Sequence, residues 1–179
     1  PDVPPPDGLK DLTAVAADIS DKIPMKLRRF MTKERPFEFR PVDPLNFDAR
    51  KKLPPRKHVW IRAVDALPDD RALHQNLLAY VSDFELLATS TLPHGLSFTR
   101  GNLVMASLDH ALWFHREFRM DQWLLYSMDS PNASGARGFA RGELFTRGGD
   151  LVASTSQEGL IRLIDPAKRK PRSNPRDQQ

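Results

Sequence analysis

The sequence predicts an α+β fold in which one long helix lies across a single curved antiparallel sheet. Two strand-like runs come before one long amphipathic segment, and four strand-like runs come after it. The segment "RGGD" joins the last two runs, and a Gly-Gly pair tolerates the positive φ angles of a tight hairpin turn. A chain of 179 residues is long enough for one such domain with a real core and some appendages.

The first part of the chain is rich in proline, because ten of the 16 prolines lie in residues 1–55. The opening "PDVPPPDG" can begin neither a helix nor a central strand, so it predicts a linker or an extended arm. Residues 11–31 form a short amphipathic pattern that breaks at Pro24, which predicts a short helix. Since natural chains rarely begin with a bare linker, we expect this chain to be the second part of a longer protein.

Two strands are predicted before the long helix. Residues 36–42 alternate in polarity, with Phe37 and Phe39 on one face. Residues 58–67 are rich in β-branched and aromatic side chains, which favour a strand.

The long helix is predicted to begin at Pro68 and to run for about 20 residues. The two aspartates after Pro68 suit the free N–H groups and the positive dipole end of a first turn. Apolar residues recur along it at spacings of three and four, and they are Leu73, Leu77, Tyr80, Phe84 and Leu87. The segment "LPHG" ends the helix, and the strands that follow are expected at 102–115, 122–130, 136–146 and 151–164.

The composition excludes several classes of protein. The absence of cysteine excludes a disulfide scaffold, a thiol nucleophile and a thiolate zinc site, and it fits a reducing compartment. No apolar run approaches the length of a membrane span, and no segment has the pattern of a signal peptide. The net charge of +4 allows nucleic acid, anionic lipid or an anionic small molecule as a partner. We interpret the basic residues 166–179 as a solvated, disordered tail rather than a nucleic-acid patch.

The segment "ASLDHALWFHREF" at residues 106–118 looks like a self-contained site. In a regular strand, Ser107, Asp109 and His115 share one face and His110 lies on the other, so these residues cannot form a metal site without a bulge. Ser107 and His115 would lie roughly 26 Å apart at ~3.3 Å per residue, too far for a nucleophile and its base. We therefore interpret both histidines as structural. The core face of this strand is assigned to its even positions, Val104, Leu108, Leu112 and Phe114.

Two other polar residues stand out. Asp83 is placed in the middle of the long helix at the edge of its apolar stripe, where a carboxylate is costly unless it is hydrogen-bonded, functional or able to reach water. Gln157 has the parity of the buried face of the last strand, and a buried glutamine needs partners for two donors and an acceptor. Each residue has a structural interpretation and a functional one.

The chain resembles the C-terminal half of the acyl-CoA thioesterase II family. The resemblance rests on many segments in order, namely "PDVPPPDGL", "FEFRPV", "VWIRA", "PDD", "LHQNLLAYVSD", "LPHG", "SLDHALWFHREF" and the run from "QWLLYSMDS" to "QEGLIRL". Members of that family are two fused hotdog domains, each a long helix wrapped by an antiparallel sheet. The resemblance implies a hotdog fold at 36–165, preceded by a Pro-rich arm with a short helix at 1–35.

The resemblance also implies a catalytic set. In the family an Asp, a Ser or Thr and a Gln together hold the hydrolytic water, and the matching positions here are Asp83, Ser107 and Gln157. Asp83 would be the general base, while Ser107 and Gln157 would orient the water. The implied function is hydrolysis of acyl-CoA thioesters to free fatty acid and CoA, with no cofactor and no metal. A backbone N–H is expected to stabilise the oxyanion, with the Gln157 amide as the alternative.

Family members are about twice as long as this chain, so we expect it to pair with an N-terminal hotdog half or with a second copy. The alternative function is a non-catalytic half that binds acyl-CoA or supports assembly. A weaker alternative is a basic nucleic-acid-associated domain, although the partners that we expect include no nucleic acid and no membrane span. The last residues, "RDQQ", do not resemble the peroxisomal tripeptide, which favours the cytoplasm over the peroxisome.

Overall fold

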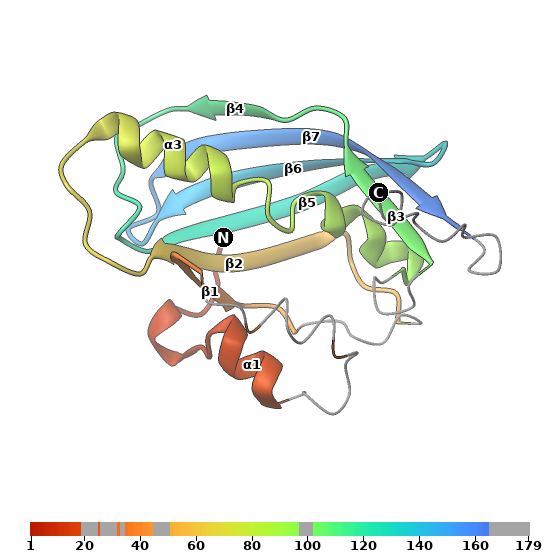
Figure 1. Cartoon of the computed structure of the whole chain (residues 1–179), viewed down its shortest axis with the longest axis horizontal. Helices are drawn as coiled ribbons and strands as arrows, with labels where there is room; N and C mark the ends of the chain where they lie inside the picture. The colour runs from red at the N-terminus through yellow and green to blue at the C-terminus, as the bar shows by residue number, and fades with distance from the viewer. Residues whose placement is uncertain (19–24, 26–31, 33–34, 45–50, 97–101, 165–179) are drawn as a thin grey trace, which may run out of the picture.

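The computed structural model describes residues 1–18, 25, 32, 35–44, 51–96 and 102–164. Figure 1 shows a curved sheet with helix α3 lying across one of its faces. The sheet has seven antiparallel strands in the order β1, β2, β5, β6, β7, β3, and β4 also pairs with β7. The strands are β1 Phe37–Pro41, β2 Arg56–Ala63, β3 Leu103–Ser107, β4 Ala111–Phe114, β5 Leu124–Ser134, β6 Arg137–Thr146 and β7 Leu151–Leu163. The predicted α+β architecture is confirmed.

The hairpin between β6 and β7 forms at the predicted Gly-Gly turn. Gly149 adopts a φ of 94°, which is accessible to glycine at no steric cost. Its backbone N–H donates to the carbonyl of Thr146 over 3.0 Å and closes the turn.

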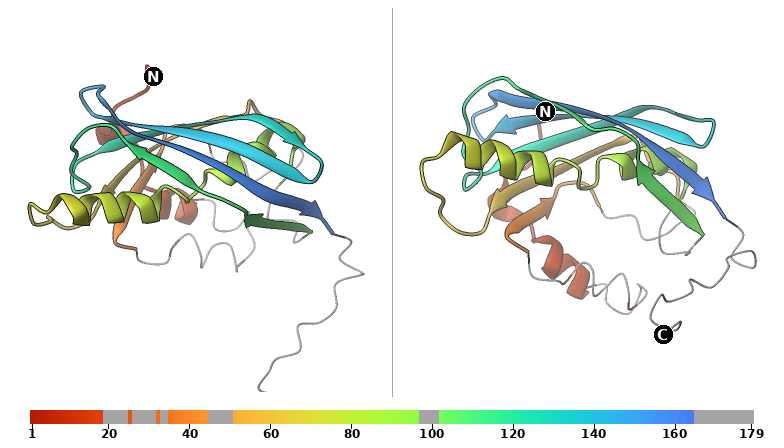
Figure 2. Two further views of the ribbon diagram at one scale, coloured as in Figure 1. Left: turned by 90° about the horizontal axis from the view of Figure 1, so that it is seen from above. Right: turned by 45° about the horizontal axis from the view of Figure 1, so that its top comes forward.

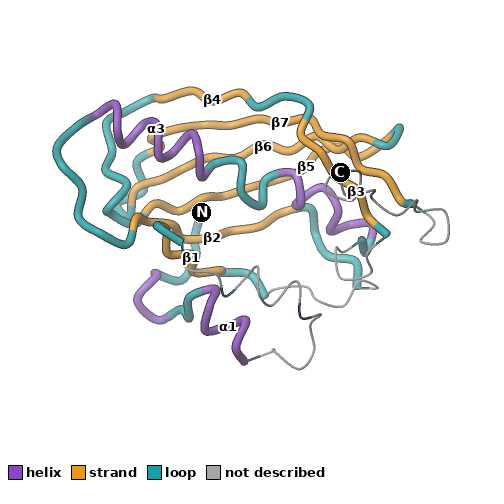
Figure 3. Tube along the Cα trace, viewed as in Figure 1, coloured by secondary structure: helices purple, strands orange, loops and turns teal. Residues whose placement is uncertain are grey.

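The long helix is shorter than predicted. Helix α3 spans Arg71–Val81, and Asp70 caps its start by accepting hydrogen bonds from the first free backbone N–H groups. Glu85 has a φ of 68°, in the left-handed region, so the α-helical ladder cannot continue through it. A short 3-10 helix, η3 at Leu87–His94, follows this turn and ends at Gly95, which has a φ of 60°. Figure 3 shows the interruption as a loop between the two helical segments.

Contacts made after the helix explain why it stops. The Glu85 carboxylate forms an ion pair with Lys57 on β2, and this lysine lowers the pKa of Glu85. The strand is 28 positions away in the sequence, so helical periodicity could not indicate this contact. As a consequence Asp83 lies just beyond the end of α3, and its predicted position in the middle of a helix is wrong.

The buried face of α3 also differs from the predicted stripe. Its buried residues are His74, Leu78 and Val81, whereas Tyr80 is 60% exposed. The rings of Tyr80 and Phe84 instead stack on two aromatic rings of β1, Phe37 and Phe39. Leu87 does reach the core, because Gly159 on β7 leaves room for its methyl groups.

The predicted strand at 102–115 is two strands, β3 and β4, which pair with successive parts of β7. Ser107 lies opposite Gly159, and Ala111 lies opposite Ser156, so three residues of one strand face two of the other. This extra residue is a β-bulge, and it reverses which side chains point to each face. The backbone N–H groups of residues 108 and 109 both approach the carbonyl of Glu158, at 2.9 and 3.4 Å.

The bulge overturns the predicted core face of this segment. Val104 and Leu108 are 39% and 57% exposed, and Phe114 is 39% exposed, so none of the three is buried. Of the four residues assigned to the core, Leu112 packs against it while partly buried. β3 and β4 lie at the free edge of the sheet (Figure 1), and this edge leaves their apolar side chains uncovered.

The opposite face of the sheet has its own apolar cluster, formed by Trp60, Trp123 and Leu125. The first residues of the chain lie on it: Val3 and Leu9 pack against the cluster, and the indole N–H of Trp60 donates to the carbonyl of Pro4 over 2.9 Å. Figure 2 shows the N-terminus on the side of the sheet away from α3. The Pro-rich start therefore packs against the domain, but it is not extended throughout, because Pro6–Gly8 form a short 3-10 helix, η1.

The other predicted segments are described only in part. A short helix, α1 at Leu12–Asp18, begins where the 11–31 helix was predicted, and most of the remainder, with Pro24, lies outside the described residues. The basic residues 166–179 also lie outside them. Within the described part of the chain, none of the helices is both long and apolar enough to cross a membrane.

Candidate active site

Asp83, Ser107 and Gln157 come together at the end of α3. The Gln157 Nε2 lies 2.5 Å from Asp83 Oδ1 and 3.0 Å from Ser107 Oγ. Ser107 Oγ lies 3.4 Å from the same Asp83 oxygen. The three residues come from the turn after α3, the end of β3 and the middle of β7, so the fold brings together positions far apart in the sequence.

The amide of Gln157 has a defined orientation. Its neighbour at 2.5 Å is a carboxylate oxygen of Asp83, which when ionised can only accept a hydrogen bond, so the nearer amide atom must be the donating nitrogen. Gln157 is fully buried, as its strand parity predicted. Its Oε1 is buried too and has no hydrogen-bond partner among the described residues. The N–H groups of this side chain contact Asp83 and Ser107, the other two residues of the set.

Asp83 and Ser107 are exposed, whereas Gln157 beneath them is buried. The set is therefore closed to solvent at Gln157 and open to solvent at Asp83 and Ser107. At 3.4 Å the contact between Ser107 and Asp83 is at the long limit of a hydrogen bond, so it is easily exchanged for one with a bound water. The arrangement offers a carboxylate acceptor, a hydroxyl and an amide donor around one point.

His110 joins this site, which the sequence interpretation missed. Its Nε2 lies 2.9 Å from Ser82 Oγ, and its Nδ1 lies 3.4 Å from Gln157 Nε2. A regular strand would have directed this ring to the other face, and only the bulge turns it toward Ser107. The sequence would have placed His110 in the site only if a bulge had been assumed in the "LDH" segment.

The other two polar residues of the segment do not enter the site. His115 Nε2 pairs with Ser154 Oγ at 2.9 Å, which is the structural role predicted for it. Asp109 accepts a hydrogen bond of 2.7 Å from the backbone N–H of Glu158 and so closes the bulge. The described residues hold no group of three or more His, Cys, Asp or Glu side chains that could bind a metal ion.

Tyr126 supports the end of α3 from below. Its hydroxyl donates to the Ser82 carbonyl over 2.7 Å and lies 3.0 Å from Thr155 Oγ1. Burial raises the pKa of the Tyr126 phenol far above its ordinary value, so it stays a donor. Gly142 makes room for the ring, since a Cβ there would lie 2.3 Å from a Tyr126 carbon. The hydrogen bond from Tyr126 to the Ser82 carbonyl holds the peptide unit that precedes Asp83.

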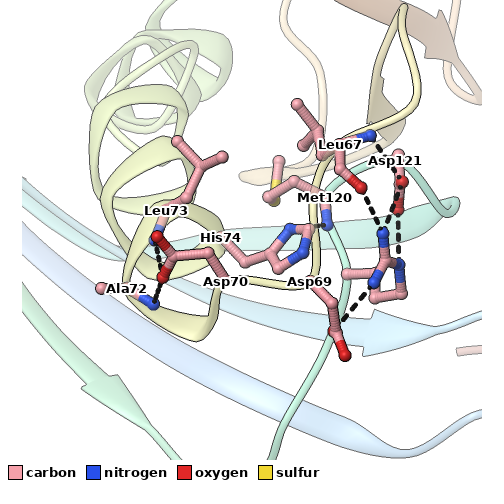
Figure 4. Close-up of polar contacts among 9 residues, drawn as sticks. Leu67, Asp69, Asp70, Ala72, Leu73, His74, Met120 and Asp121 are labelled. Carbon is pink, nitrogen blue, oxygen red and sulfur yellow. Dashed lines mark hydrogen bonds and ion pairs between the residues drawn. The ribbon is translucent and has the colours of Figure 1, made fainter.

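The start of α3 is held by a separate cluster (Figure 4). Buried His74 accepts a hydrogen bond of 3.0 Å at Nδ1 from the backbone N–H of Met120. Next to it, Arg119 pairs with Asp121, and Asp121 also accepts from the Leu67 backbone N–H. These contacts, with the Arg119 hydrogen bond foremost, lower the pKa of Asp121 to about 2. The helix that leads to Asp83 is therefore held at both ends.

Comparison with known proteins connects this geometry to a family. The model of the acyl-CoA thioesterase family matches residues 27–160. The chain is 37% identical to "Acyl-CoA thioesterase 2" of Haemophilus influenzae over 165 residues, which cover 92% of this chain and 58% of that protein.

Solved structures show the same relationship. The crystal structure of an acyl-CoA thioesterase II from Mycobacterium marinum is 39% identical, with a TM-score of 0.67, and the match covers 91% of this chain and 55% of that one. A hot dog fold protein from Alicyclobacillus acidocaldarius, 17% identical with a TM-score of 0.62 over 92% of this chain and 55% of that one, supports the predicted hotdog fold alone. The chain thus spans about half the length of the relatives that it matches.

Proposed function

Because the chain belongs to the acyl-CoA thioesterase family, we propose that it hydrolyses acyl-CoA thioesters to free fatty acid and CoA, with a water activated by Asp83, Ser107 and Gln157. The observation that carries the proposal is the meeting of these three side chains within 2.5–3.4 Å of one another. Since the chain spans about half of its relatives, the activity is proposed for the assembled protein.

Asp83 is the general base in this proposal. Its carboxylate is exposed, so a water can reach it, and it accepts a proton as the water oxygen attacks the thioester carbonyl carbon. The tetrahedral intermediate then collapses, the C–S bond breaks, and the proton passes from Asp83 to the leaving thiolate of CoA. No cofactor or metal takes part in any step.

Ser107 and Gln157 position the water rather than attack the substrate. Among the described residues, no histidine is placed to activate Ser107, because His110 directs its two ring nitrogens at Ser82 and Gln157. The Asp83 carboxylate near Ser107 serves the water in this proposal. The Gln157 N–H groups already face Asp83, Ser107 and His110, which favours a backbone N–H as the oxyanion donor.

The decisive test is a thiol-release assay with acyl-CoAs of several chain lengths. We expect Asp83→Asn to lose roughly 10²- to 10⁴-fold in kcat, since the loss of a general base has about that effect. Ser107→Ala should lose less, because it removes only orientation of the water. His115→Asn is the matched control and should leave the rate unchanged. Near-wild-type turnover by folded Asp83→Asn, with circular dichroism unchanged, would refute the assignment.

We further propose that the domain pairs with an N-terminal hotdog half or with a second copy. The support is the free β3–β4 edge, where Leu108 and Trp113 are 57% and 52% exposed. Large exposed apolar patches on a soluble domain mark interaction surfaces. Light scattering after size-exclusion chromatography should report a dimer of this chain when it is expressed alone. A stable monomer at micromolar concentration would contradict pairing between copies.

The remaining assignments are proposals of the same kind. We propose that 36–165 is the hotdog domain and that 1–35 is an arm. Packing of Val3 and Leu9 on the outer face of the sheet supports an arm that stays with the domain. We place the reaction in the cytoplasm, with the peroxisome as the alternative, which cell fractionation would decide.

A further inference from the structure

His110 occupies a position between the three segments that build the active site. Its ring contacts Ser82, the last residue before Asp83, through one nitrogen, and Gln157 through the other, at 2.9 and 3.4 Å. The ring therefore connects the turn after α3 to the middle of β7.

The protons of this connection can be placed on one tautomer. Ser82 Oγ donates to the carbonyl of Ala79 over 3.1 Å, so it has a lone pair but no proton left for His110. His110 Nε2 must then carry the hydrogen and donate it to Ser82. Its Nδ1 keeps a lone pair, which faces the Gln157 N–H group. The opposite tautomer would place two donors against each other at Gln157, whose orientation the Asp83 carboxylate determines.

Gln157 Nε2 has two hydrogens but three acceptors around it. One hydrogen goes to Asp83 at 2.5 Å, and the second is shared between Ser107 at 3.0 Å and His110 at 3.4 Å. When the Ser107 hydroxyl turns toward a bound water, the lone pair of His110 is the remaining acceptor for that second hydrogen. The amide then stays in place while Ser107 is released.

The ring is not needed to close the bulge that presents it. Two backbone N–H groups and the Asp109 carboxylate already bind the backbone of Glu158, and that pairing closes the bulge without the imidazole. The function of the imidazole therefore lies in its contacts with Ser82 and Gln157.

We propose that His110 is a positioning residue for the hydrolysis proposed above, on which this inference rests. As the neutral Nε2–H tautomer it holds the amide of Gln157 and the hydroxyl of Ser82, and it thereby keeps Asp83 and Gln157 aligned. It acts through these two residues.

The test compares three substitutions of one residue in the assembled protein. The amide of His110→Asn places an acceptor near the Nδ1 position and preserves the contact with Gln157. The longer His110→Gln reaches Ser82 but not Gln157, and His110→Ala removes both. We expect kcat to fall roughly 10- to 100-fold in the Ala and Gln variants with KM within about twofold, and to recover within about threefold in Asn. His115→Asn is the control.

Equal kcat in all three variants would overturn the proposal, and so would rescue by Gln but not by Asn. If Asp83→Asn retains wild-type turnover, the proposed function fails instead. A second measurement does not depend on turnover. The ¹⁵N shifts of the His110 ring, recorded about two pH units above the ordinary histidine pKa, should report the Nε2–H tautomer. An Nδ1–H tautomer would refute the inference.

Discussion

The two sides of the end of α3 differ in what they contact. On the aromatic side, Tyr80 and Phe84 stack on Phe37 and Phe39 of β1, with ring centroids 6.0 and 5.9 Å apart. On the polar side, Asp83 and its neighbours meet Ser107, His110 and Gln157. Along the chain, Tyr80 and Phe84 of the aromatic side flank Ser82 and Asp83 of the polar side.

The aromatic side stabilises the fold, whereas the polar side carries the candidate site. Stacked aromatic pairs contribute about 0.5–1.5 kcal/mol each beyond the area that they bury, and their rings have few rotamers. The polar side holds contacts as long as 3.4 Å and is open to solvent, so its groups can exchange partners. The aromatic side thus sets the position of the backbone, and the polar side keeps the freedom that the proposed activation of a water requires.

The largest expected effect on stability comes from removing a ring of the aromatic side. Phe39→Ala should lower the free energy of unfolding by about 3–5 kcal/mol, because it removes a buried ring and leaves a cavity under Phe84. Urea denaturation followed by tryptophan fluorescence measures it. Phe114→Ala is the control, since Phe114 is partly exposed at the free edge and should lose clearly less. Equal losses would mean that the aromatic side has no special role.

A smaller effect is expected between the two sides, at Tyr126. Tyr126→Phe leaves the buried Ser82 carbonyl without its donor, which should cost about 1–3 kcal/mol. The same change at exposed Tyr80 should cost almost nothing, and denaturation of both variants provides the comparison. If the two substitutions cost the same, the bond to Ser82 does not hold the end of α3.

Acid should act at the start of α3 and leave the aromatic side intact. The folded pKa of Asp121, about 2, lies below its ordinary 3.8, so its stabilisation is complete above about pH 4 and is lost as the pH falls toward 2. Asp121→Asn should remove this part of the acid sensitivity, on the order of 1 kcal/mol. Melting temperatures measured between pH 5 and pH 2 test it. An unchanged slope in the variant would contradict the prediction.

The smallest effect lies on the outer face of the sheet. Arg141 and Asp129 form an ion pair there, and both side chains are about half exposed. Exposed pairs contribute little, so Arg141→Ala should change the free energy of unfolding by less than about 0.5 kcal/mol and leave kcat unchanged. A loss above 1 kcal/mol would show that the outer face takes part in holding the site.

Local pattern indicated only part of the candidate site, and the resemblance to the family supplied the rest. The parity of the last strand predicted that Gln157 is buried, and resemblance to the family selected the same three residues that the fold brings together. The segment around His110 is predicted as one regular strand, so His110 is assigned to the wrong face, while His115 has the structural contact predicted for it. One extra residue in a strand has no signature in composition or spacing.

The sequence by itself determined the order of strand and helix segments along the chain, the aspartates that precede α3 and the Gly-Gly hairpin, since each depends on residues a few positions apart. Only the tertiary structure decided where α3 ends, where the bulge lies and where the Pro-rich start packs. These features depend on pairs such as Lys57 with Glu85 and Asp109 with Glu158, which folding brings together from distant segments. The arrangement of the candidate site around Asp83 belongs to this second group, because a turn and a bulge, not a periodic element, place its side chains.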